Sequence, residues 1–171
     1  MKKTIKTLHL LLCTALLLAS CVKEEQGTRL QPGDRLPEFK TYTLTGRNVS
    51  SADLAGKPSV IILFSTTCPD CHRQLPEVEA AYAKAGRDAT FLAIARDEPA
   101  ETVEAFWKKS GYSMPAAAPG NRTIYDLFDR GSKTGVPQVY ISDGQGEIIR
   151  TADDSAVLPS YEILNSLYGY D

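Results

Sequence analysis

The stretch SVIILFSTTCPDCHRQLP, residues 59–76, carries the strongest structural signal in this chain. Residues 59–65 form a compact apolar run rich in β-branched side chains, which is typical of a strand buried on both faces of a sheet. The motif Cys68-Pro69-Asp70-Cys71 follows, and apolar residues with helical spacing continue to residue 85. The stretch therefore predicts a buried strand, a C-x-x-C motif and a helix in direct succession.

This order places Cys68 at a helix N-terminus, where unpaired backbone N–H groups favour negative charge. The thiolate is the reactive form of cysteine, so this position suits thiol–disulfide exchange. Pro69 fits the first helical position, where its missing N–H is not needed. Cys71 follows three residues later on the same helical face. We therefore expect Cys68 and Cys71 to be the catalytic pair, with Pro69 and Asp70 between them.

The same letters also permit other sites. With His72 the motif becomes C-x-x-C-H, the attachment site of c-type haem, with His72 as proximal ligand and Met114 as the available distal ligand. Haem sites of that type are mostly helical, whereas this motif follows a strand, so a c-type haem electron carrier is the weaker interpretation. Two cysteines and one histidine leave zinc without a fourth ligand, so no metal site is predicted.

Two further alternatives to a dithiol enzyme are a peroxidase and a non-catalytic binding domain. A peroxidase of the peroxiredoxin type requires Pro and Thr seven and three residues before its cysteine, where this chain has Ile61 and Ser65. A non-catalytic, lipid-anchored binding domain with a silent disulfide stays open. That alternative predicts that replacing both cysteines leaves function intact.

The N-terminus has the form of an export signal. Three lysines precede an apolar segment, residues 8–18, that is too short to span a membrane. Residues 18–21, Leu-Ala-Ser-Cys, resemble the bacterial lipobox. We expect a lipoprotein signal peptide at residues 1–20, lipidated Cys21 with a polar tether to residue 34, and one domain at residues 35–171. An ordinary signal with unmodified Cys21 is the alternative.

Export changes the meaning of the four cysteines. Cys13 leaves with the signal and Cys21 carries lipid, which leaves Cys68 and Cys71 as thiols. A bridge across so short a loop stabilises little, so the pair is better explained by redox chemistry. Loss of three lysines and no acid lowers the net charge from −2 to −5. No basic patch remains, so nucleic acid is not a predicted partner.

The expected location is the cell envelope, as a lipoprotein of the outer membrane that faces the periplasm. Residues 23–25, Lys-Glu-Glu, resemble the surface-export signal of Bacteroidetes lipoproteins. A solvated linker is the alternative for these three residues, and surface exposure stays open.

Strand-like and helix-like segments alternate through the rest of the chain, which predicts an α/β domain with a central mixed sheet covered by helices on both faces. A short helical turn capped by Ser50 or Ser51 is expected to end at Leu54. The strands are expected at residues 39–44, 59–65, 90–95, 138–142 and 147–151, and the helices at residues 69–85, 101–109, 123–128 and 160–168.

A buried strand, C-x-x-C at a helix start and Val136-Pro137 before a β-hairpin together resemble the thioredoxin fold. Over about residues 30–168 the chain is more closely similar to the membrane-tethered TlpA/ResA family of thiol–disulfide oxidoreductases, which the run 146–148, Gly-Glu-Ile, also matches. The resemblance implies an insertion at residues 97–119 and a cis Pro137 facing the dithiol. It also implies that Val136 offers its backbone to a client peptide as an added strand.

The chain departs from this family at several positions. The family commonly has a glutamate that assists proton transfer from the second cysteine, where this chain has Gln74. The group that activates Cys71 is therefore open between water and Asp70. Thr67 replaces the usual tryptophan before the first cysteine, and Ile62 stands where thioredoxin has a buried aspartate.

The expected activity is reduction of disulfides in exported proteins, with no cofactor beyond the Cys68–Cys71 disulfide. The expected partners are protein clients with thiols or disulfides, an upstream dithiol donor, and the membrane through the lipid. The expected direction of electron transfer, from this protein to its client, follows from Asp70. Its negative charge destabilises the Cys68 thiolate, and a less stable thiolate makes the disulfide a weaker oxidant. His72 and Arg73 act the other way but are expected to extend into water. The identity of the client and the donor stays open.

Overall fold

The computed structural model describes residues 27–118, 122–132 and 135–169. Its core is a five-stranded sheet in the order β5-β4-β3-β6-β7. β4 runs parallel to both β3 and β5, whereas β6 runs antiparallel to β3 and β7. These strands are β3 Ser59–Phe64, β4 Thr90–Ala95, β5 Ala116–Ala117, β6 Gln138–Ser142 and β7 Ile148–Ala152. The predicted mixed central sheet is confirmed.

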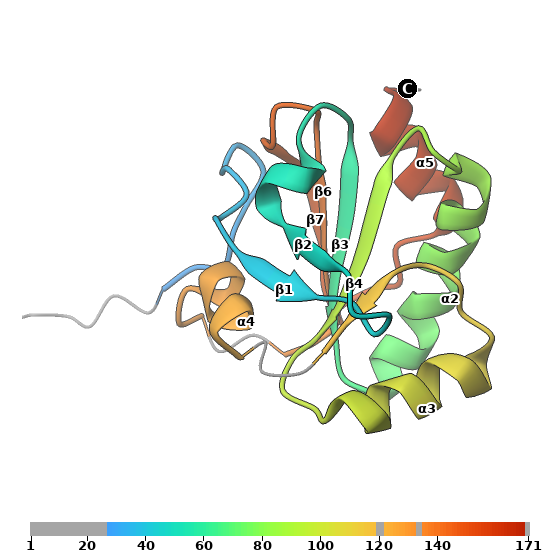
Figure 1. Cartoon of the computed structure of the whole chain (residues 1–171). Helices are drawn as coiled ribbons and strands as arrows, with labels where there is room; N and C mark the ends of the chain where they lie inside the picture. Colours follow the sequence, from blue (N-terminus) through green and yellow to red (C-terminus); the bar gives the residue numbers. More distant parts are fainter. Residues whose placement is uncertain (1–26, 119–121, 133–134, 170–171) are drawn as a thin grey trace, which may run out of the picture.

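Helices cover both faces of this sheet, also as predicted (Figure 1). Helices α2 and α5 pack together on one face, and α3 lies at the end of the sheet near the start of α2. Helix α4 lies on the other face beside a small antiparallel sheet of β1 and β2. The remaining elements are β1 Lys40–Tyr42, β2 Asn48–Ser50, the 3-10 turn η1 Ser51–Leu54, α2 Pro69–Ala85, α3 Ala100–Ser110, α4 Arg122–Asp129 and α5 Ser160–Tyr168.

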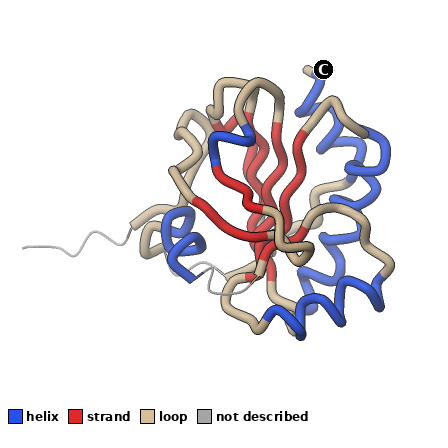
Figure 2. The backbone as a smooth tube through the Cα atoms, viewed as in Figure 1, coloured by secondary structure: helices blue, strands red, loops and turns tan. Residues whose placement is uncertain are grey.

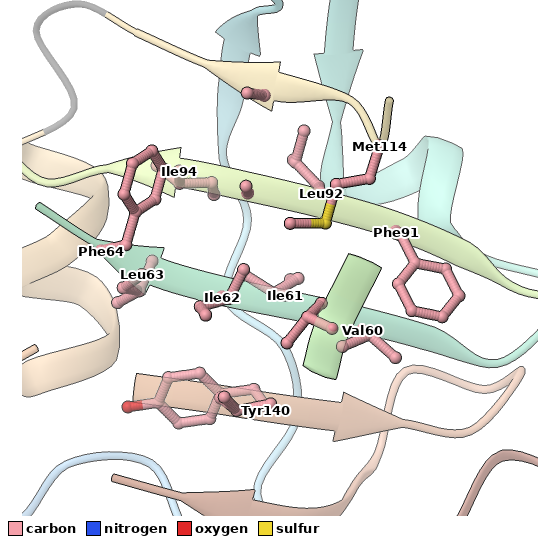
Figure 3. Close-up of a cluster of buried hydrophobic side chains, with 14 of the residues drawn as sticks. Val60, Ile61, Ile62, Leu63, Phe64, Phe91, Leu92, Ile94, Met114 and Tyr140 are labelled. Atoms are coloured by element: carbon pink, nitrogen blue, oxygen red, sulfur yellow. The ribbon is translucent and has the colours of Figure 1, made fainter. Parts of the chain in front are cut away.

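The central strands lie in the interior of the domain, between helices and loops (Figure 2), and their side chains form a buried apolar cluster (Figure 3). Burial on both faces explains why these strands are mostly apolar. Every residue of β3 is buried, and so is every residue of β6. Figure 3 shows Ile61, Leu92 and Met114 among the side chains that fill this core. Burial on both faces holds β3 firmly, and the end of β3 fixes where the C-x-x-C motif begins.

The predicted insertion between β4 and the following elements contains α3 and β5. β5 extends the sheet by pairing with β4 through Ala93 and Ala116. Strands β5 and β2 were not predicted from the sequence. Strands of two and three residues are too short to show an alternating pattern, so their positions depend on pairing partners distant in the chain. None of the helices in the described part of the chain is long and apolar enough to cross a membrane.

Candidate active site

Cys68 lies at the N-terminal cap of α2, one short loop after the buried strand β3. Its sulfur accepts a hydrogen bond from the backbone N–H of Cys71 at 3.3 Å. Pro69 occupies the first helical turn, as expected, and Gly86 ends the helix with a φ of 59°. The helix N-terminus thus supplies an N–H donor to the Cys68 sulfur, which favours negative charge there.

The two thiols differ in exposure. Both are free in this structure, but Cys68 is partly exposed while Cys71 is fully buried. Burial raises the pKa of the Cys71 thiol, and its hydrogen bond with the Cys68 side chain raises it further. Cys71 therefore keeps its proton in the reduced protein, and Cys68 is the sulfur that an incoming disulfide can reach.

Pro137 brings a second segment to the dithiol. The Val136–Pro137 bond is cis, as the family resemblance implied. The Cys68 thiol donates a hydrogen bond to the carbonyl oxygen of Val136 at 3.1 Å. Residues 68 positions apart in the chain thus meet at the site, and the Val136 backbone lies beside the accessible sulfur.

The side chain of Gln138 holds the backbone before Pro137 in place. This role was not predicted from the sequence. Its side-chain amide donates to the carbonyl oxygen of Gly135 at 3.0 Å, and Tyr140 donates its hydroxyl to Gln138 Oε1 at 2.6 Å. The amide also lies 3.3 Å from Oδ1 of the buried Asp129. A buried polar network therefore fixes the backbone next to Pro137. A lone glutamine in an apolar strand is the only sequence signal it leaves.

The loop between β3 and Cys68 is held by Glu98, which the sequence analysis also missed. Its carboxylate accepts the backbone N–H of Thr66 at 2.8 Å and the hydroxyl of Thr66 at 2.7 Å. His72 Nε2 donates to the carbonyl oxygen of Thr66 at 2.6 Å, and its ring stacks on Phe106 with centroids 5.3 Å apart. His72 is exposed, as expected, but its ring is held by Thr66 and Phe106 and does not move freely in the solvent.

Asp70 and Arg73 form an ion pair with an N···O distance of 2.5 Å. Arg73 is 61% exposed, as expected, but it pairs with Asp70, so the charge of Asp70 is not uncompensated as the sequence had suggested. The pair lies three residues apart on one helical turn, which is the spacing at which side chains meet. Asp70 therefore opposes a thiolate at Cys68 less strongly than a free carboxylate would.

A narrow crevice lies beside the dithiol. It is lined by Pro137 and three residues of α2, and by four residues of the loop between β7 and α5: Asp70, Arg73, Gln74, Asp153, Asp154, Ala156 and Val157. The Ser155 hydroxyl beside Asp153 lowers the pKa of that carboxyl, so it stays ionised at neutral pH. Val157 exposes an apolar side chain at the rim. The crevice itself is too narrow to admit a water molecule, so a polypeptide next to Cys68 would contact its rim.

The side chains that haem attachment would require have other partners. His72 Nε2 bonds to Thr66, and Met114 is buried in the sheet core (Figure 3). Within residues 27–118, 122–132 and 135–169, no group of three or more His, Cys, Asp or Glu side chains could hold a metal ion. Cys21, the expected lipidation site, lies outside the described residues, so it remains a prediction.

Comparison with known proteins gives consistent results. Residues 32–151 match the sequence profile of the AhpC/TSA family. The thiol–disulfide oxidoreductase ResA of Halalkalibacterium halodurans is 25% identical over 119 residues, which cover 69% of this chain and 66% of that protein. A candidate peroxiredoxin of Mycobacterium tuberculosis is 26% identical over 144 residues, covering 80% of this chain and 88% of that protein.

Solved structures share the fold. A candidate protein disulfide isomerase of Bacteroides thetaiotaomicron superposes with a TM-score of 0.75 and 23% identity, covering 84% of this chain and 94% of that one. The exposed lipoprotein thioredoxin Etrx1 of Streptococcus pneumoniae gives a TM-score of 0.64 and 17% identity, covering 78% and 99%. Both alignments include most of the described domain, and the sheet with its C-x-x-C helix is therefore a thioredoxin-like fold.

Proposed function

Because this chain belongs to the AhpC/TSA family and is a thiol–disulfide oxidoreductase similar to ResA, we propose that Cys68 and Cys71 reduce disulfides of exported proteins. The observation that supports these roles is the asymmetry of the pair. Cys68 presents a partly exposed sulfur at a helix start, and Cys71 is buried directly beneath it. Val136 offers a backbone against which a client chain can align beside that sulfur.

The reaction proceeds in two exchanges. The Cys68 thiolate attacks one sulfur of the client disulfide, and the other client sulfur leaves as a thiolate and takes up a proton. Cys71 then loses its proton and attacks the Cys68 sulfur, which releases the second client sulfur and forms the Cys68–Cys71 disulfide. Two electrons pass to the client, and an upstream dithiol restores the reduced pair.

Insulin reduction tests this activity. Residues 22–171, with dithiothreitol as electron donor, should reduce insulin disulfides well above the rate of dithiothreitol alone. Cys68→Ser should abolish the gain, while Thr102→Ser on the exposed side of α3 should leave it unchanged. Equal rates for wild type and Cys68→Ser would refute the assignment and favour a non-catalytic binding domain.

A peroxidase is the second candidate, because a candidate peroxiredoxin is among the relatives. Ile61 and Ser65 replace the proline and threonine of the peroxidase motif, so we expect hydrogen peroxide to be consumed more slowly than insulin disulfides are reduced. Consumption of peroxide that outpaces insulin reduction, at equal protein and donor concentrations, would reverse this order.

We also propose that lipid on Cys21 tethers the domain to the outer membrane. The motif at residues 18–21 supports this, as does the similarity in fold to a lipoprotein thioredoxin. Cys21→Ala should release the domain from membranes or block its processing. A correctly processed Cys21→Ala protein that still fractionates with membranes would contradict the tether. Protease treatment of intact cells separately tests whether residues 23–25 direct the protein to the surface.

A further inference from the structure

Helix α2 carries Gln74 one turn beyond Cys71, on the same buried face. The glutamine is only 1% exposed, whereas most glutamine side chains in proteins lie at the surface. Its Oε1 accepts the backbone N–H of Leu158 at 2.7 Å, and its Nε2 donates to the Leu158 carbonyl oxygen at 2.9 Å. One amide side chain therefore satisfies both backbone groups of one buried residue, 84 positions away in the chain.

Leu158 ends the loop between β7 and α5, and this loop forms one wall of the crevice beside Pro137. One turn further along α2, Glu77 Oε2 accepts the backbone N–H of Ser160 at 2.7 Å, at the start of α5. The Glu77 bond therefore fixes the start of α5, and the Gln74 bonds fix the loop that precedes it. The N-terminal part of the loop is also held by the ion pair of Asp153 with Arg29 at 2.6 Å. The Gln74 bonds are the contact that ties its C-terminal part, at Leu158, to helix α2.

We propose that Gln74 is a positioning residue for the exchange reaction, which holds the wall formed by residues 153–157 where a client chain beside Cys68 meets it. This inference rests on the proposed function, because it takes the rim of the crevice, where Val157 is exposed, as the surface that the client contacts. Gln74 has no ionisable proton, so it acts through the wall and not by moving a proton to or from Cys71. Ordering the wall before the client arrives lowers the cost of binding.

The chemistry of the amide gives a sharp way to test this role. A leucine at position 74 can make neither bond. A glutamate can make both only as the neutral acid, since an ionised glutamate would place a second negative oxygen against the Leu158 carbonyl. Gln74→Glu should therefore keep the wall in place at low pH and release it as the pH rises, while Gln74→Leu releases it throughout.

Other ionisable groups face position 74 and are common to all variants. Cys71 and Glu77 lie on the same helix, and the crevice and its rim add Asp70, Arg73, Asp153 and Asp154. Each variant is therefore compared with wild type at the same pH, so that only the ratio of the two is interpreted. Gln145→Glu, in the exposed turn between β6 and β7, serves as the matched control for an added carboxylate.

The experiment measures kcat and KM for insulin reduction at pH 5.5 and pH 8, with hydrogen exchange of the Leu158 amide as a readout that is independent of activity. We expect Gln74→Leu to raise KM about tenfold at both pH values. Gln74→Glu should match wild type at pH 5.5 and approach Gln74→Leu at pH 8, with faster exchange of the Leu158 amide there. Gln145→Glu should match wild type at both.

Two results would overturn the positioning role. One is an unchanged KM and an unchanged Leu158 exchange rate in Gln74→Glu at pH 8. The other is a Gln74→Glu protein whose kcat rises above wild type at pH 8, which would assign the position to proton transfer with Cys71. A wild-type protein without insulin-reducing activity would instead refute the proposed function itself, so the two failures are distinguishable.

Discussion

The accessible sulfur of the dithiol belongs to Cys68, and the protected one belongs to Cys71. Cys68 is partly exposed at the cap of α2, and Cys71 lies buried one turn inside the helix. An incoming disulfide can meet only the first sulfur without disturbing the fold. The second sulfur can then reach the mixed disulfide from within the protein.

Trapping of clients tests this order. Cys71→Ser should accumulate mixed disulfides with exported proteins, because Cys68 can still attack but nothing resolves the product. Cys68→Ser should accumulate none. Non-reducing gels and mass spectrometry of the captured species provide the measurement. Mixed disulfides found only with Cys68→Ser would reverse the two roles.

Burial of Cys71 also predicts how its thiol responds to pH. Because burial raises the pKa of this thiol, its reactive thiolate forms only at pH values above those of an ordinary cysteine. In the Cys68→Ser protein, Cys71 should react with iodoacetamide at least tenfold more slowly at pH 8 than free cysteine does, and unfolding in urea should remove the difference. Rapid alkylation of native Cys71 at pH 8 would contradict its burial.

Asp70 shows what the sequence could not reveal about a single residue. Its position in the motif was evident, but its ion pair with Arg73 depends on the rotamers of an exposed and a partly exposed side chain. The pair reduces the effect of the carboxylate on the Cys68 sulfur. Gln74 is a second example. The sequence shows that a glutamine at this position cannot transfer a proton, but it does not show that the side chain bonds to Leu158.

Substitutions at this ion pair should move the redox potential in opposite directions. Asp70→His removes a negative charge beside the Cys68 thiolate and should raise the potential, whereas Arg73→Gln frees the carboxylate and should lower it. We expect shifts of roughly 10 to 20 mV, because exposed ion pairs are weak. Equilibration with glutathione measures both proteins. A lower potential for Asp70→His would contradict the electrostatic argument.

At the scale of elements, the long helix and the buried strands could be predicted and the contacts between their connecting loops could not. The predicted bounds of α2, β4 and α5 agree with the structure, because each shows a strong apolar period and a cap or turn residue. The loop before Cys68 depends on Glu98, which lies 32 residues from Thr66. An acidic residue in a polar loop carries no periodic signal.

Loss of Glu98 should loosen the start of α2. Glu98→Ala leaves the Thr66 N–H and hydroxyl without their acceptor, which should lower the free energy of unfolding by about 1 to 2 kcal/mol. Glu101→Ala, three residues further in the exposed first turn of α3, is the control and should change it little. Urea unfolding provides the values. Equal stabilities of the two variants would show that Glu98 does not hold the loop.

At the scale of the whole molecule, the fold brings together three parts of the chain that are remote in sequence. The β3–α2 junction supplies the dithiol, the segment before β6 supplies Pro137, and the β7–α5 loop supplies the opposite wall of the crevice. The first two could be predicted, since both leave short motifs in the sequence. The β7–α5 loop could not be predicted as part of the site, because its position depends on the bonds between the Leu158 backbone and Gln74, which leave no motif in the sequence.

The redox potential of the Cys68–Cys71 pair tests the central claim most directly. Residues 22–171 are equilibrated in dithiothreitol or glutathione buffers, and the fraction of reduced pair is counted by thiol labelling and mass spectrometry. The account predicts one reversible two-electron transition, with a potential closer to the value of about −270 mV for thioredoxin than to about −120 mV for DsbA. A potential near −120 mV, or the absence of a reversible Cys68–Cys71 disulfide, would contradict a disulfide reductase.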